Sequence, residues 1–254
     1  NLCTFVEVSR NKDKKSRPEI LFQRPDLGEI QGSYDLVSPR LSEKQVSRMQ
    51  DHVEFLCAEI PTLLSRMNSK HSSDQVFPGQ LSFKSANTFP AQAGVASSAS
   101  SFAAFTLGTL MAHFESPSVF SEFWDGKKEK ILRELSLLSR QGSGSSCRSF
   151  GGPWVYWEKE EAVSLSDVSL PELSDIVILV NQDAKMVSSS EAHRRITTSP
   201  LWNGRVERAN ERVVKLKEAI ASGDMQTVSK VSWDEFWDMH SLFHTSDPNF
   251  TYWK

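Results

Sequence analysis

The chain has 254 residues, 39% of them hydrophobic and 24% charged, and a formal net charge of −3. This length can bury a sizeable core and could hold two domains. The slight negative charge, without a basic stripe interleaved with aromatic residues, excludes a general affinity for nucleic acid. The sequence has no apolar run of membrane-spanning length, so we expect no membrane partner. Three cysteines at no metal-ligand spacing favour reduced thiols in a cytoplasmic protein.

The first elements along the chain are two strands and a long helix. Residues 2–8 and 19–23 alternate or run apolar, which predicts two paired strands joined by the basic segment 10–17 as an exposed hairpin loop. A helix is predicted over 42–67, because apolar residues recur there at steps of three and four. They are Val46, Met49, Val53, Leu56 and Ile60. A further strand is predicted over 80–88.

A small-residue, hydroxyl-rich stretch follows that strand. Residues 87–101 read NTFPAQAGVASSASS and lead into an apolar pattern that predicts a helix from Ser97 to Phe114. Gly94 permits backbone conformations barred to other residues, and the first amides of the helix have no partners within it. Such a helix start binds anions, and phosphate is its natural ligand. The alternative is that Ser97 or Ser98 only caps a buried helix.

A second Gly/Ser segment lies between a predicted amphipathic helix over 127–140 and a predicted strand over 153–157. Residues 139–157 read SRQGSGSSCRSFGGPWVYW. Two glycines allow the backbone to approach a ligand closely, while hydroxyl groups and a guanidinium, which binds carboxylate or phosphate through two bonds, lie nearby. These groups belong to Ser143, Ser145, Ser146 and Arg148. The alternative is a flexible turn with a solvated arginine.

Cys147 and a histidine pair suggest two other functions. A thiol beside Arg148 could be an activated nucleophile, but no general base has a supporting spacing, so Cys147 is interpreted as a packing residue. His240 and His244 are spaced to face one metal ion, with Asp238 close by, yet a third ligand is not evident. The surrounding apolar residues predict a core face instead. They are Trp233, Phe236, Trp237, Met239, Leu242 and Phe243.

The rest of the chain predicts a second layer of helix and sheet. Polar residues around 164–174 mark a domain boundary, a buried strand is predicted over 175–180, and helical patterns fill 203–245. Between them, Ser188 to Ser190 precede a helical stretch where a diphosphate could bind. Helices packed on sheets in this order indicate an α+β protein.

Four segments resemble known families. P-A-Q-A-G-V-A-S-S-A resembles the phosphate loop P-x-x-x-G-L-x-S-S-A of the GHMP small-molecule kinases, with Val95 in place of leucine. Residues 139–157 are similar to S-R-x-G-S-G-S-A-C-R-S-x-x-G-G-x-x-x-W of the diphosphomevalonate decarboxylases. VSSSEAHRRITTSPLW is similar to V-S-S-x-x-G-M-x-x-T-x-x-T-S-P-L of the same enzymes, and FWDMHSLFHTSDPNFTYW matches one of their helices and turns. The segments occur in that family's order.

The resemblance implies an α+β, two-domain GHMP-kinase-like fold with helix-on-sheet layers and an active site in the cleft between domains. Residues 1–168 would form the N-terminal nucleotide-binding domain and residues 169–254 the C-terminal domain. It also implies ATP-dependent decarboxylation of mevalonate 5-diphosphate to isopentenyl diphosphate by a homodimer, with ATP and Mg2+ as cofactors and magnesium at Ser98. The residues expected to hold ATP phosphates are Gly94, Val95, Ala96, Ser97 and Ser98.

Substrate contacts carried over from the family fall in both expected domains. They are Ser143, Ser145, Arg148 and Ser189. Arg148, as the catalytic residue, would lie near the carboxylate that leaves as carbon dioxide. The family's K-Y-x-G-K segment and its D-A-G-P-N segment, which holds the catalytic aspartate, do not occur here. We therefore expect an excerpt of a longer enzyme, and phosphate binding with little turnover from these residues alone.

One segment departs from the family pattern. Ser190 stands where bacterial members often have an arginine, and Ala192 and His193 replace a G-M pair. The missing positive charge would then come from Arg194 or Arg195. Because that charge bears on how many phosphates the ligand carries, a phosphomevalonate decarboxylase, a mevalonate-type kinase and an inactive phosphate-ligand-binding paralogue stay open as alternatives.

Overall fold

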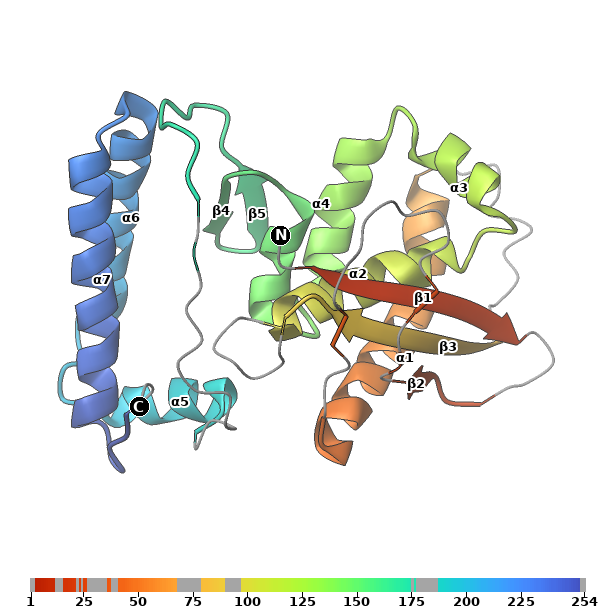
Figure 1. Ribbon diagram of the computed structural model, residues 1–254, viewed down its shortest axis with the longest axis horizontal. Coiled ribbons are helices and arrows are strands. Elements are labelled where there is room, and N and C mark those ends of the chain that lie inside the picture. Colours follow the sequence, from red (N-terminus) through yellow and green to blue (C-terminus); the bar gives the residue numbers. More distant parts are fainter. Residues whose placement is uncertain are drawn as a thin grey trace. The chain divides into compact units, whose positions relative to one another are not determined.

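The computed structural model (Figure 1) describes residues 3–11, 16–21, 23, 25–26, 36–37, 41–67, 79–89, 97–174, 176 and 187–251. The chain divides into two compact units, Asn1–Ser164 and Leu165–Lys254. None of the helices in the described ranges is long and apolar enough to cross a bilayer. The domain boundary expected after residue 168 stays a prediction.

A three-stranded sheet organises the first unit. Its strands are β1 (Thr4–Asn11), β2 (Glu19–Leu21) and β3 (Gln80–Asn87), in the order β1-β3-β2. β1 pairs antiparallel with β3, and β2 pairs parallel with it. The predicted hairpin between the first two strands is therefore wrong, because the strand predicted over 80–88 lies between them.

Two arginines at the ends of the predicted loop bind other parts of the first unit, and Arg17 is exposed as predicted. Arg10 donates to the carbonyl oxygen of Ala112 at 3.1 Å. Arg17 donates to the carboxylate of Glu54 at 3.1 Å. Arg10 thus binds the segment that follows α2, and Arg17 binds α1 although its side chain stays exposed. Residues 12–15 lie outside the described part of the chain.

The sheet has one apolar and one polar face because its residues alternate. Phe83 of β3 is fully buried and lies opposite Val8 of β1, on the face that the helices cover. Glu7 and Lys84, the next pair in the register, have their charged groups 2.8 Å apart on the other face. The backbone N–H of Asp26 donates to Glu7, and this bond, with Lys84, lowers the pKa of the Glu7 carboxyl group. The alternation therefore fixes the register of the strands.

Two helices cover the apolar face of the sheet (Figure 1). α1 (Glu43–Arg66) begins after Ser42, whose hydroxyl accepts the capping hydrogen bond, and α2 is Ser97–Met111. Both confirm predicted helices. α2 lies close to β1 at Gly108, where a Cβ atom would be 2.7 Å from Val8 Cγ2. A side chain at this glycine would therefore separate the helix from the strand.

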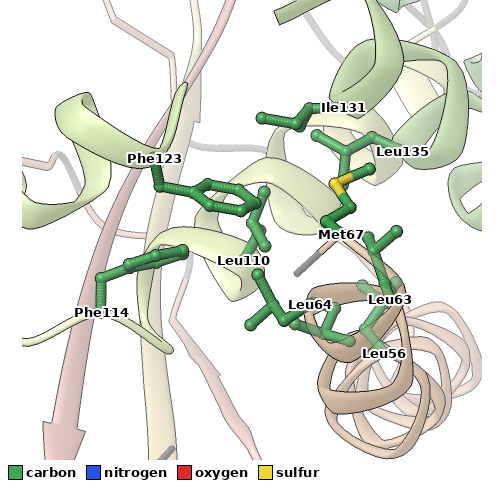
Figure 2. Packing of buried hydrophobic residues seen from close by; sticks show 10 residues of the cluster. Leu56, Leu63, Leu64, Met67, Leu110, Phe114, Phe123, Ile131 and Leu135 are labelled. Atoms are coloured by element: carbon green, nitrogen blue, oxygen red, sulfur yellow. The ribbon is translucent and has the colours of Figure 1, made fainter. Parts of the chain in front are cut away.

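A second buried cluster joins four helices (Figure 2). Besides α1 and α2, it includes α3 (Pro117–Trp124) and α4 (Lys128–Ser139), of which α4 confirms the helix predicted over 127–140. The apolar patterns do not predict α3, although a capping serine followed by proline is a usual helix start. Phe114 and Phe123 pack with ring centroids 5.0 Å apart. Other members are Leu56, Leu63, Leu64, Met67, Leu110, Ile131 and Leu135.

The Gly/Ser segment and a hairpin complete the first unit. Gly144–Phe150 forms a 3-10 helix, η1, instead of an irregular turn, while Arg148 is exposed, as the alternative interpretation expected. β4 (Val155–Glu158) confirms the strand predicted over 153–157. It pairs antiparallel with β5 (Glu161–Ser164), a strand that was not predicted.

The described residues of the second unit are mostly helical. They form α5 (Ser189–Arg195), η2 (Ile196–Thr198), α6 (Arg205–Ser222) and α7 (Met225–Thr245). α6 and α7 confirm the helices predicted over 203–245 and lie side by side (Figure 1). The strand predicted over 175–180 falls outside the described residues, except for Ile176, which is not in a strand.

The aromatic tract of α7 is only partly buried. Leu242 and Phe243 are 0% and 7% exposed and pack in a cluster with residues of α5, as predicted for a core face. Trp233, Phe236 and Trp237 are 61%, 41% and 44% exposed. The predicted core face is therefore wrong for these three residues, because the side of α7 that binds α6 carries carboxylates instead.

An ion-pair network joins α6 to α7. Asp238 accepts hydrogen bonds from Arg208 at 2.9 Å and from Arg212 at 2.5 Å. Glu235 binds Arg212 at 2.9 Å and also the buried guanidinium of Arg205. The bonds from Arg208 and then Arg212 lower the pKa of Asp238 from its ordinary 3.8 to about 2, although burial acts in the opposite direction.

Asp238→Asn should destabilise the protein at neutral pH but not in strong acid. Because the pKa of Asp238 is lower in the folded state, ionised Asp238 stabilises the fold above pH 3.8, and this contribution is lost as the pH falls through about 2. We expect a loss of about 1–2 kcal/mol near pH 7, limited by partial solvent exposure, and almost none near pH 2. Denaturant unfolding at both pH values measures it.

Asp234→Asn is the matched control, since its i,i+4 pair with Lys230 is exposed. It should change the free energy of unfolding little at either pH. A difference between wild type and Asp238→Asn that stays constant from neutral pH to strong acid would contradict the expected linkage.

Candidate functional site

Buried serine hydroxyls hold the Gly/Ser segment in place. Ser136 of α4 donates to the carbonyl oxygen of Cys147 at 3.0 Å. Ser146 is fully buried, and its hydroxyl lies 2.6 Å from the carbonyl oxygen of Ser143 and 3.0 Å from Ser139 Oγ. The prediction that Ser146 offers its hydroxyl to a ligand is therefore wrong, because this group joins η1 to α4.

Gly142 brings the same segment against α1 and α2. A Cβ atom there would lie 2.1 Å from Phe102 Cδ1 and 2.9 Å from His52 Cγ. Arg48 of α1 donates to the carbonyl oxygen of Gly142, and its guanidinium lies 5.3 Å from the centre of the Phe102 ring. Burial, with the nearby Arg48 charge, lowers the pKa of His52 to about 4, so its imidazole is neutral. The sequence predicted that the backbone at this glycine approaches a ligand closely. In the structure it approaches the Phe102 ring.

Three predicted substrate contacts lie on or beside η1. A 3-10 helix has three residues per turn, so Ser145 and Arg148 lie on one face. Ser145 is half-buried and Arg148 is exposed, which shows that this face meets solvent. Ser143 precedes η1 as its N-cap, is 8% exposed and makes no side-chain capping bond. Ser145 and Arg148 are therefore presented together to solvent, whereas Ser143 is buried at the start of the segment.

Arg148 lies over an indole ring. Its guanidinium carbon is 5.5 Å from the centre of the Trp157 ring, and that of Arg140 is 5.4 Å from the same ring. Arg140 Nη1 also lies 2.9 Å from the carboxylate of Glu160. Arg148 has no carboxylate within ion-pair distance among the residues that the structure describes. Its charge is therefore available to an external anion.

Cys147 faces the interior of the first unit. It is fully buried, and its Sγ lies 3.1 Å from the carbonyl oxygen of Gly144. Burial raises the pKa of the Cys147 thiol, which opposes the thiolate that a nucleophile requires. These observations support the packing role interpreted from the sequence.

Iodoacetamide at about pH 8 should label Cys3, which is half-buried, and leave Cys57 and Cys147 unlabelled in the folded protein. Burial raises the pKa of Cys57 to about 11, and it raises that of Cys147 as well. Mass spectrometry of the digested protein measures the labelling, and denatured protein, in which all three should react, is the control. Equal labelling of Cys147 before and after denaturation would contradict this expectation.

The phosphate-loop prediction falls largely outside the described residues. Residues 90–96 and the side chain of Ser97 are not described, which leaves three expected ATP contacts unplaced. They are Gly94, Val95 and Ala96. Ser98 is exposed in the first turn of α2, four residues before Phe102 and on the same side of the helix. Because Phe102 packs on Gly142, the start of α2 lies beside the Gly/Ser segment.

Ser189 lies in the second unit, at the start of α5. Ser188 caps this helix by accepting from the backbone N–H of Glu191 at 3.2 Å, and Ser189 is exposed in its first turn. Arg194 and Arg195 donate to the Glu191 carboxylate at 3.1 and 2.7 Å, and these bonds lower its pKa. The positive charges expected to replace the missing arginine are therefore already engaged by Glu191.

His240 and His244 of α7 are not part of a metal site in the described residues. The His240 ring packs against Phe236 with centroids 4.2 Å apart. Across the described residues, no three His, Cys, Asp or Glu side chains are close enough to hold a metal ion. Magnesium at Ser98 stays a prediction.

The sequence did not predict the supporting residues of this site. Arg140 and Trp157 stand within the quoted Gly/Ser pattern, so their fixed spacing from Arg148 was a usable signal. Arg48 lies 94 residues before Gly142, and nothing in the local pattern connects the two. Phe102 was expected only as part of an apolar helix.

The α+β scaffold, with α2 packed against the Gly/Ser segment, is the GHMP-kinase-like fold. Residues 37–169 match the diphosphomevalonate decarboxylase-like N-terminal domain, and residues 176–254 match the mevalonate 5-diphosphate decarboxylase C-terminal domain. The chain belongs to the diphosphomevalonate decarboxylase family.

Individual relatives agree with this assignment. The diphosphomevalonate decarboxylase of Saccharomyces cerevisiae is 30% identical over 206 residues, which cover 76% of this chain and 49% of the relative. The structure of a mevalonate diphosphate decarboxylase from Legionella pneumophila has a TM-score of 0.70 at 29% identity, covering 100% of this chain and 70% of that one. MDDEF in complex with MVAPP, AMPPCP and magnesium has a TM-score of 0.63 at 19% identity, covering 99% and 66%. The chain spans about half the length of the curated relatives it matches.

Proposed function

We propose that the protein catalyses the ATP-dependent decarboxylation of mevalonate 5-diphosphate to isopentenyl diphosphate, with release of ADP, phosphate and carbon dioxide, in the mevalonate pathway of isoprenoid biosynthesis. The observation that carries this proposal is the exposed guanidinium of Arg148, which shares a face of η1 with Ser145 and lies over Trp157. Membership of the decarboxylase family supports it.

The reaction depends on positioning and charge neutralisation. Phosphoryl transfer from ATP to the tertiary hydroxyl makes that oxygen a leaving group. The C–O bond then breaks as phosphate departs, and the C–C bond to the carboxylate supplies the electron pair of the new double bond while carbon dioxide leaves. Arg148 would hold the carboxylate through two hydrogen bonds, and Ser143 and Ser145 would donate to the substrate.

ATP would bind at the start of α2. The exposed Ser98 hydroxyl and the first amides of this helix fit a phosphate group, and Gly94, Val95, Ala96 and Ser97 would complete the cradle. Mg2+ at Ser98 would neutralise phosphate charge when bound. The complex of MDDEF with AMPPCP, MVAPP and magnesium supports these ligands. Ser189 would contact the substrate diphosphate. The enzyme would be a cytoplasmic homodimer.

The test is an assay of the intact protein with mevalonate 5-diphosphate, ATP and Mg2+. ADP, carbon dioxide and isopentenyl product are measured separately, and we expect equal amounts of the three. ADP formation without carbon dioxide would show a kinase instead. Binding of ATP by calorimetry, without any turnover, would show an inactive paralogue. Either outcome overturns the proposal.

A monophosphate substrate is the second candidate. It is favoured because Ser190 replaces the family's arginine and because Arg194 and Arg195 are both bound to Glu191. Less positive charge at this helix suits a ligand with one phosphate fewer. The ratio of kcat/KM for mevalonate 5-phosphate and mevalonate 5-diphosphate decides between them, and a ratio above one would favour the monophosphate.

A further inference from the structure

Trp157 is contacted by two guanidinium groups at the edge of the candidate site. The guanidinium carbons of Arg140 and Arg148 lie 5.4 and 5.5 Å from the centre of its ring. The ring also meets the Gly/Ser segment, since a Cβ atom at Gly144 would be 3.4 Å from Trp157 Cη2. The indole N–H donates to the carbonyl oxygen of Lys159 at 3.2 Å. The ring is thus fixed by its own hairpin and touches the segment that carries Arg148.

The two arginines differ in their other partners. Arg140 donates to the carbonyl oxygens of Lys159 and Glu160, at 3.3 and 2.7 Å, and to the Glu160 carboxylate at 2.9 Å. Its side chain is 19% exposed, so it anchors the β4–β5 hairpin to the end of α4. Arg148 is exposed and has no carboxylate partner in the described ranges. The indole face is therefore the fixed surface against which Arg148 lies.

We propose that Trp157 is a positioning residue that orients Arg148 toward the substrate carboxylate. This role rests on the proposed function. A guanidinium that lies on an aromatic face keeps its N–H donors, which are in its own plane, available for a planar carboxylate. Without the ring, binding of the substrate must itself order the long arginine side chain. This costs binding free energy and leaves the guanidinium less well aligned with the carboxylate.

Trp157→Leu and Trp157→Phe in the intact protein test this role. Decarboxylation should slow about 10-fold or more in Trp157→Leu, mainly in kcat, and much less in Trp157→Phe, which retains an aromatic face. Trp154→Leu is the matched control, because Trp154 is half-buried in the same segment and lies over no guanidinium among the described residues. Equal losses in the Leu and Phe variants of Trp157 would overturn the proposal.

The double variant Arg148→Ala with Trp157→Leu distinguishes positioning from a general structural role. Because Trp157 acts through Arg148, the double variant should be no slower than Arg148→Ala alone. Fully additive losses would show that Trp157 contributes independently of Arg148, and would overturn the inference.

A spectroscopic measurement separates this inference from the proposed reaction. In 15N NMR, the ring current of Trp157 should displace the Arg148 side-chain N–H resonance, which is identified by its disappearance in Arg148→Lys. The displacement should persist in Trp157→Phe and vanish in Trp157→Leu. A resonance that does not move in Trp157→Leu overturns the positioning role, with or without turnover. A displaced resonance in a protein that releases no carbon dioxide overturns the proposed function alone.

Discussion

Arg148→Ala should lower the rate of carbon dioxide release roughly 100- to 1,000-fold while the protein stays folded. The side chain is exposed, so its removal leaves no cavity, and no carboxylate in the described residues loses a partner. What is lost is the two-pronged hydrogen bonding to the substrate carboxylate as its charge redistributes. Arg148→Lys should recover only part of the rate, because an ammonium lacks the planar fork. Steady-state assays of carbon dioxide release measure both variants.

Arg133→Ala is the matched control for that variant. Arg133 is also exposed in the first unit, and it pairs with Glu161 on the β4–β5 hairpin. Its removal should leave turnover unchanged, because exposed ion pairs contribute little. Near-normal carbon dioxide release from Arg148→Ala, with an unchanged unfolding midpoint, would remove Arg148 from the mechanism.

Gly142→Ala should destabilise the first unit by about 1–3 kcal/mol or more. The added methyl group would lie 2.1 Å from Phe102 Cδ1 and 2.9 Å from His52 Cγ, so helix and loop must separate. That separation also displaces the Gly/Ser segment from the start of α2, and turnover should fall further than the unfolding free energy alone explains. Thermal unfolding and the decarboxylation assay, run on the same preparation, measure the two effects.

Gly152→Ala provides the comparison, since a Cβ atom there meets nothing within 4 Å. It should leave both the unfolding midpoint and turnover close to wild type. In a Phe102→Ala background, which is itself destabilised, Gly142→Ala should cost less free energy of unfolding than it does in the wild type, because the smaller side chain makes room for the methyl group. An unfolding midpoint of Gly142→Ala equal to that of Gly152→Ala would show that the contact with Phe102 is not tight.

The long helices were predictable because their signals are local. The three- and four-residue spacing of apolar residues is enough to predict α1 and α4. The partner of β1 and β2 was not predictable. Both strands pair with β3, which lies far along the chain. Adjacent strands separated by a charged turn look like a hairpin whenever the partner strand is distant in sequence.

In the candidate site, too, local patterns were predictable and contacts between distant residues were not. Ser143, Ser145 and Arg148 were predicted as site residues because they stand together in one pattern, and they stay a prediction. Cys147 was given a packing role because no base accompanies it, and its burial agrees with that role. Ser146 was misread, since composition does not distinguish a hydroxyl that donates inside the fold from one that faces solvent. Burial in η1 depends on which of its residues meet α4, and a Gly/Ser run does not reveal those contacts.

The short period of η1 also limits how the sequence can vary in length. Each residue of a 3-10 helix turns the chain by about 120°, so inserting or deleting one residue between Ser145 and Arg148 would move the guanidinium to a different side of the segment. An exposed loop of similar composition would absorb such a change by bending. Natural or engineered length variation should therefore be excluded from these few positions.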